Sequence, residues 1–105
     1  MKVAICGSPP LAQQMQEVFK DIDFKFFIRD FISSGGGLSS NLPLINFFEF
    51  RRLVNASELD GLIIANNARS DFTKAVVQCC KLYAIPKIGV IDLTLPNPVT
   101  PIYWL

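Results

Sequence analysis

Two short stretches of the sequence carry residue types suited to binding a phosphate-bearing ligand. In the first, Gly7 and Ser8 follow a short apolar run, where a dinucleotide-binding glycine loop would join a strand to a helix. Ala12 fits the last position of that pattern, but Pro9 replaces its middle glycine. Pro9 and Pro10 also lack backbone N–H groups, which are the groups that cradle phosphate. The match to a nucleotide-binding loop is therefore partial.

The second stretch follows another apolar run and contains Asn66, Asn67 and Arg69. Asparagine side chains bind ligand hydroxyls and amides, and Arg69 can pair with a phosphate. A purely structural reading stays open, in which Asn67 or Ser70 caps a helix and the rest is turn chemistry.

Asp30 is a third candidate. It lies about 20 residues beyond Gly7, near where an acidic residue binds a ribose hydroxyl in dinucleotide-binding domains. The structural alternative is a tight strand-to-helix turn at Gly7 with a solvated Asp30.

The composition lacks the groups of most catalytic and metal sites. The chain has no histidine, which removes the usual general base near neutral pH and the commonest metal ligand. Its three cysteines are Cys6, Cys79 and Cys80, an odd number that does not indicate a disulfide framework. We expect reduced thiols buried in the core. No serine has a candidate base, so we expect no catalytic residue. Cys79 and Cys80 would diverge on a helix and have no third ligand, so we expect no metal site.

Apolar, β-rich segments alternate with segments of helical periodicity along the chain. We expect strands at 2–6, 24–32, 42–45, 62–65 and 87–91, and helices over 9–22, 47–54 and 71–83. This alternation is typical of a parallel sheet covered by helices. The predicted fold class is α/β, a Rossmann-like three-layer α/β/α domain with a parallel sheet of four to five strands. Segments 3–6, 62–65 and 87–91 should lie side by side in its interior.

The candidate residues all follow predicted strands. In open parallel sheets, ligands bind beyond the carboxyl ends of the strands, where the strand order reverses. We therefore expect one ligand-binding site, formed by Gly7, Ser8, Asp30, Asn66, Asn67 and Arg69.

Length and charge exclude several classes of protein. The 105 residues allow one domain, and half of them are apolar, which suffices for a packed core. The net charge of +1 provides no basic field for nucleic acid. The apolar run at 3–6 is too short for a signal peptide or a membrane span. We expect a cytoplasmic protein that binds neither nucleic acid nor membrane.

Two segments interrupt this pattern. Residues 33–41 form a Gly/Ser-rich stretch, which is typical of a mobile or ligand-binding loop. Residues 93–105 contain Pro96, Pro98 and Pro101 and end on an apolar run. We expect a domain over 1–92 and, over 93–105, a proline-rich tail or a linker to a missing downstream domain.

Four segments, 3–7, 42–45, 58–65 and 85–88, together carry a resemblance to a known group of domains. The chain resembles the small Rossmann-like N-terminal domains of bacterial polysaccharide-biosynthesis proteins. Examples are the nucleotide-sugar-binding domain of sugar acyltransferases and the leading domain of FkbM-type methyltransferases. The resemblance implies that Gly7, Ser8 and Asp30 hold a nucleotide sugar. It also implies that the catalytic residues belong to a downstream domain of the same protein.

Three functions follow as expectations. The first is an accessory domain that binds a nucleotide or nucleotide sugar, or NAD(P), and is not catalytic alone. The second is a protein-interaction or scaffolding domain with a degenerate cleft, which forms homo-oligomers through its aromatic surface or tail. The third is a phosphocysteine carrier of the sugar phosphotransferase type at Cys6, against which Pro9 and Pro10 argue.

Overall fold

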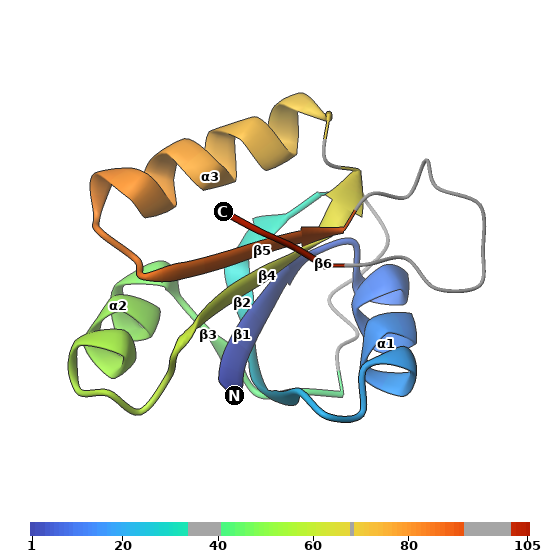
Figure 1. The fold of residues 1–105 in the computed structure, drawn as a ribbon, viewed down its shortest axis with the longest axis horizontal. Coiled ribbons are helices and arrows are strands. Elements are labelled where there is room, and N and C mark those ends of the chain that lie inside the picture. The colour runs from blue at the N-terminus through green and yellow to red at the C-terminus, as the bar shows by residue number, and fades with distance from the viewer. Residues whose placement is uncertain (34–40, 68, 92–101) are drawn as a thin grey trace.

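A computed structural model of the protein describes residues 1–33, 41–67, 69–91 and 102–105 (Figure 1). The elements in chain order are β1 (Lys2–Gly7), α1 (Pro9–Val18), β2 (Asp23–Ile32), β3 (Leu44–Ile45), α2 (Phe47–Asn55), β4 (Gly61–Asn67), α3 (Asp71–Leu82), β5 (Lys87–Ile91) and β6 (Ile102–Trp104). The chain is thus an α/β protein, as predicted. None of the helices in the described ranges is long and apolar enough to cross a membrane.

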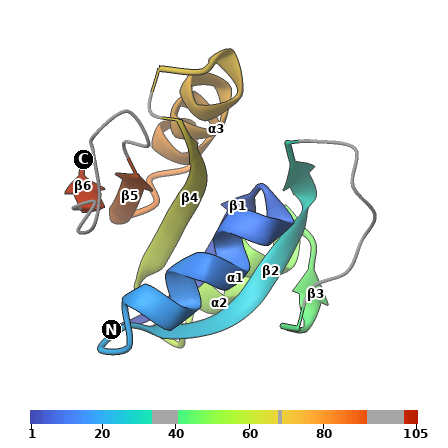
Figure 2. The ribbon, with the colours of Figure 1, turned by 90° about the vertical axis from the view of Figure 1, so that its right-hand side faces the viewer.

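The strands form one mixed sheet in the order β3-β2-β1-β4-β5-β6 (Figures 1 and 2). All neighbouring pairs from β3 to β5 are parallel, and β6 runs antiparallel to β5. The chain builds the sheet outward from β1, first to β2 and β3 on one side, then to β4 and β5 on the other. The expected side-by-side, parallel arrangement of segments 3–6, 62–65 and 87–91 is confirmed.

The sheet is larger than the predicted four to five parallel strands. It has six strands, because Ile102–Trp104 pairs with the edge of β5, with Val90 opposite Tyr103. The segment follows the last proline of the chain, so all three of its residues retain the backbone N–H groups that a ladder requires. The expected linker over 93–101 and the expected loop over 34–40 lie outside the described residues.

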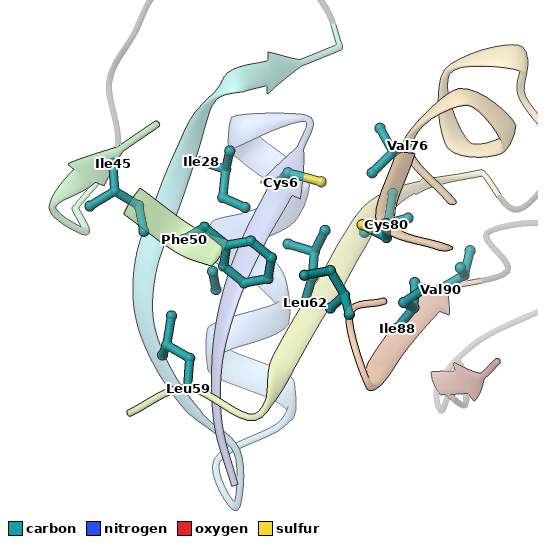
Figure 3. Packing of buried hydrophobic residues seen from close by; sticks show 13 residues of the cluster. Cys6, Ile28, Ile45, Phe50, Leu59, Leu62, Val76, Cys80, Ile88 and Val90 are labelled. Atoms are coloured by element: carbon teal, nitrogen blue, oxygen red, sulfur yellow. The ribbon is translucent and has the colours of Figure 1, made fainter. Parts of the chain in front are cut away.

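Helices cover both faces of the sheet. On one face, Val3 and Ile5 of β1 pack with Ala12 and Met15 of α1. On the other face, alternate residues of the strands pack with α2 and α3. Figure 3 shows this second core, to which Cys6, Ile28, Phe50, Leu62, Val76 and Cys80 contribute. Because β1 and β4 are buried on both faces, their sequences read as continuous apolar runs.

Side-chain caps fix where two of the helices begin. Asn46 Oδ1 accepts a hydrogen bond from the Glu49 N–H at 2.7 Å and so caps the start of α2. Ser70 caps α3 in the same way, through the Thr73 N–H at 3.1 Å. The first helix is shorter than predicted and ends at Val18, and Ile22 packs on the core from the turn that follows it.

Candidate ligand site at the carboxyl edge of the sheet

The end of β1 lies where the strand order reverses, between β2 and β4. Gly7 is in register with Ala65 of β4 and with Ile32 of β2. The Ser8 N–H donates to the Ala65 carbonyl oxygen at 3.0 Å, and the Ser33 N–H donates to the Gly7 carbonyl oxygen at 3.2 Å. These contacts place Gly7 and Ser8 directly beside the end of β4, whose last two residues are Asn66 and Asn67. With Arg69, whose N–H is bonded to Asn67, the structure therefore brings together five of the six predicted site residues.

Gly7 is required at this position for a reason that lies in the backbone. Its φ is 110°, a conformation that side-chain-bearing residues rarely adopt. A Cβ added to Gly7 would also stand 2.5 Å from the Ala65 carbonyl oxygen, well inside van der Waals contact. The glycine thus serves the close approach of β1 to β4. A phosphate needs no part in this explanation.

The loop from Ser8 to Ala12 offers few backbone donors to an anion. Pro9 and Pro10 have no N–H, and the Ser8 N–H is bonded to Ala65. The Ala12 N–H donates to the Ser8 carbonyl oxygen at 2.8 Å. Among these five residues, only the Leu11 N–H could donate a hydrogen bond to a ligand. An anion at this edge must therefore be bound mainly by side chains.

The two asparagines that end β4 use their side-chain oxygens locally. Asn66 Oδ1 accepts from the Asn67 N–H at 2.6 Å, and Asn67 Oδ1 accepts from the Arg69 N–H at 3.0 Å. Among the described residues, no hydrogen bond from either side-chain NH₂ group is found. The side-chain NH₂ group of each asparagine can therefore donate hydrogen bonds to a ligand. The side-chain-to-backbone hydrogen bonds of a turn, which the sequence suggested, are present, and they leave the NH₂ groups available to a ligand.

Arg69 is exposed at the same turn. Within the ranges that the structure describes, its guanidinium takes part in no ion pair, and the one ion pair there joins Lys25 to Asp23 at 3.0 Å. An arginine in this state presents a full positive charge and a bidentate donor face to solvent. It is the strongest anion-binding group at this edge.

Thr73, which the sequence analysis missed, holds this turn in place. It is 2% exposed, and its hydroxyl donates to the Asn67 carbonyl oxygen at 2.7 Å. The same oxygen accepts from the Ser70 N–H at 3.1 Å and from the Ser70 hydroxyl at 2.9 Å. The sequence held one signal for this role, namely a threonine three residues after Ser70, the serine that caps α3. These three bonds lock the end of β4 onto the start of α3.

Asp30 has a structural contact of its own. Its Oδ2 accepts from the Phe47 N–H at 2.7 Å, so the carboxylate caps the first turn of α2 together with Asn46. This contact is with α2 rather than with the Gly7–Ser8 loop. The sequence alone is compatible with Asp30 as a ribose ligand or as a solvated side chain. Its role as a cap depends on an element 17 residues further along the chain, which no local pattern indicates.

The thiols lie largely in the core, as expected. Cys6 is fully buried and Cys80 is buried, whereas Cys79 is partly exposed, and all three are free. Burial, and next the nearby Cys80, raise the pKa of the Cys6 thiol well above its ordinary value of 9.0. Burial, and next Cys79, raise the pKa of Cys80 to about 12. A protonated, enclosed thiol is a poor nucleophile, which argues against phosphate transfer at Cys6.

Within the described ranges, no group of three or more Cys, Asp or Glu side chains could hold a metal ion. No protein-family model, no curated protein and no solved structure matches this chain. The choice of ligand therefore depends on the donors and acceptors at the edge of the sheet.

Proposed function

We propose that this chain is an accessory domain that binds a nucleotide or a nucleotide sugar at the carboxyl edge of β1 and β4. In this proposal the fold is a Rossmann-like three-layer α/β/α domain. One observation carries it, namely that the ends of β1 and β4 are joined where the strand order reverses. That edge is where open α/β sheets bind their ligands.

The side chains at this edge favour an acceptor-rich ligand. The donors are the Ser8 hydroxyl, the NH₂ groups of Asn66 and Asn67, and the Arg69 guanidinium. A nucleotide sugar matches this set, since its phosphates suit Arg69 and its hydroxyls suit the asparagines. Because Pro9 and Pro10 leave few backbone N–H groups near Ser8, Arg69 is the main phosphate ligand.

Among the acceptor-rich ligands that suit these donors, the resemblance to small Rossmann-like N-terminal domains distinguishes a nucleotide sugar from NAD(P). It favours a nucleotide sugar over NAD(P), and it places the domain in a bacterial polysaccharide-biosynthesis protein of the cytoplasm, with catalysis in a downstream domain. Asp30 enters this proposal only as a second contact to the ribose, because one of its oxygens already caps α2.

A thermal-shift screen tests the proposal. A ligand that binds only the folded state stabilises it by about 2.7 kcal/mol at 100 times its Kd. UDP-glucose, GDP-mannose and NAD⁺ at millimolar concentration should raise Tm to different extents, the nucleotide sugars most, whereas uridine should have little effect. Arg69→Gln should remove most of the shift. Arg52→Gln, an exposed arginine on α2, is the matched control and should retain it.

The proposal fails if none of these compounds raises Tm at millimolar concentration. It also fails if Arg69→Gln and Arg52→Gln respond to the nucleotide sugars to the same extent.

A second candidate function is self-association through β6. This strand lies at the edge of the sheet, and Tyr103 and Trp104 on it are 49% and 43% exposed. An edge strand with aromatic side chains is a template for pairing with the same edge of a second copy. Light scattering should then give a mass that rises with concentration and falls in Trp104→Lys. A constant monomer mass would remove this candidate.

A further inference from the structure

A hollow of about 470 Å³ lies between α3 and the β5–β6 end of the sheet. Its lining includes Lys74, Val77 and Gln78 of α3, Val90 of β5, Tyr103 of β6, and Leu105. The volume falls within the range of small-molecule sites, about 300 to 1,000 Å³. The hollow lies beside β5 and β6 and shares with the β1–β4 edge only Thr73 among its described lining residues, so it concerns a second ligand.

The hollow forms because β6 extends the sheet beyond the helices that cover this face. The last helix, α3, packs against β4 and β5, and β6 lies outside them, on the far side of β5 (Figure 2). Ile102 and Trp104 lie over Gly89, where a Cβ would come within 2.8 Å and 3.0 Å of their side chains. Tyr103, between them, points to the opposite face and borders the hollow.

The lining has an apolar wall and a polar rim. Val77 and Val90 belong to the packed core or border it, and Leu105 and the Tyr103 ring extend the apolar surface outward. Lys74 and Gln78 are one helical turn apart on α3, so they stand on the same side of the hollow. Across the described ranges, the Lys74 ammonium has no ion pair.

We propose that this hollow binds an amphipathic carboxylate, such as a medium-chain fatty acid. The alkyl chain lies against Val77, Val90 and Leu105, and the carboxylate lies beside Lys74, with Gln78 as a neutral donor. Charge selects the anion, because Lys74 is the one charged side chain among the lining residues that the structure describes. The apolar wall selects the alkyl chain and disfavours a nucleotide, which carries polar groups along its whole length.

Titration of the labelled protein, followed by amide NMR shifts, tests the proposal with three probes of equal chain length. Octanoate should shift the amides of Lys74, Val77, Gln78, Val90 and Tyr103. Octanol should bind about three to five times more weakly, the effect of losing one exposed ion pair. Octylammonium should bind more weakly still, because Lys74 repels it.

Variants of two exposed lysines on the same helix separate charge selection from general binding. Lys74→Gln should weaken octanoate binding to the level of octanol. Lys81→Gln, in the last turn of α3, should leave the preference for octanoate unchanged. Both side chains are exposed, so neither change should affect folding.

Three outcomes would overturn the proposal. The first is equal affinity for octanoate and octanol, and the second is octanoate shifts confined to other parts of the chain. The third is a dimer at working concentration in which a second copy covers Tyr103 and Leu105, so that octanoate no longer binds. The test is independent of the nucleotide proposal, because Arg69→Gln should leave octanoate binding unchanged.

Discussion

Gly7 approaches Ala65 so closely that a Cβ on Gly7 would stand 2.5 Å from the Ala65 carbonyl oxygen. The Ser8 N–H is bonded to that same oxygen at 3.0 Å. The ends of β1 and β4 are therefore joined by a backbone contact that has no room for a side chain. This contact places Ser8 beside Asn66 and Asn67, three of the residues proposed to bind the ligand.

Replacing Gly7 by alanine should destabilise the fold. The new Cβ would both meet Ala65 and force a side-chain-bearing residue to a φ of 110°. Together, strain and overpacking should lower the free energy of unfolding by at least about 2 kcal/mol. Urea denaturation measures this loss. If the free energy of unfolding fell by less than about 0.5 kcal/mol, the close approach of β1 to β4 would not be needed for stability.

Replacing Asp30 by alanine should lower the stability of the fold and should have a smaller effect on ligand binding. The change removes the acceptor of the Phe47 N–H and leaves the start of α2 with one cap fewer. Loss of a helix cap should lower the free energy of unfolding by about 1 kcal/mol. Asp23→Ala is the matched control on the same strand, since its exposed ion pair with Lys25 should contribute less than about 0.5 kcal/mol. If Asp30→Ala left stability unchanged but abolished the nucleotide-sugar shift, Asp30 would be a ligand residue and not a cap.

Stability should fall as the pH rises above about 9. Burial raises the pKa of Cys80 to about 12 and that of Cys6 well above 9.0, whereas unfolded thiols titrate near their ordinary value. Below that value both states are protonated and the stabilising contribution is complete. Between it and the folded pKa the unfolded state binds fewer protons, so each thiol lowers the free energy of unfolding by about 1.4 kcal/mol per pH unit.

Urea denaturation in the presence of a reductant, at pH 7, 9 and 10, measures this slope. Cys80→Ala should be less stable at pH 7 but should lose less stability between pH 9 and 10 than the original chain. Equal slopes in the two proteins would mean that Cys80 ionises as readily in the folded state as in the unfolded state.

Replacing Thr73 by valine keeps the shape of the side chain and removes its hydroxyl. The Asn67 carbonyl oxygen would lose one of its three donors, and the Ser70 hydroxyl would lose a neighbour at 2.9 Å. We expect a loss of about 1 to 2 kcal/mol in the free energy of unfolding. Thr73→Ser, which keeps the hydroxyl, should restore the hydrogen bonds. Equal stability of the valine and serine variants would contradict the role assigned to this hydroxyl.

The elements that the sequence predicted correctly are those with a local signal. The strand at 62–65 is a continuous apolar run, the strand at 87–91 is apolar apart from Lys87, and the helix cap at Ser70 is recognisable from its neighbours. Burial on both faces and local capping chemistry produce these patterns, so they can be read without knowledge of the rest of the chain.

The features that the sequence did not predict depend on distant contacts. The strand Ile102–Trp104 is three residues long and follows several prolines, so its pairing with β5 leaves no periodic pattern. The Asp30 cap likewise requires α2 to lie beside β2. Within the candidate site, the residue types of Asn66, Asn67 and Arg69 indicated a ligand. Only the structure shows that the side-chain oxygens of both asparagines accept hydrogen bonds from backbone N–H groups of their own turn.

Amide NMR shifts of the labelled protein during titration with UDP-glucose test the central claim most directly. The account predicts saturable shifts at Gly7, Ser8, Asn66, Asn67 and Arg69, and their loss in Arg69→Gln. Absence of shifts at millimolar UDP-glucose would contradict it. So would shifts confined to the basic cleft of α2, where Arg51 and Arg52 flank Phe48.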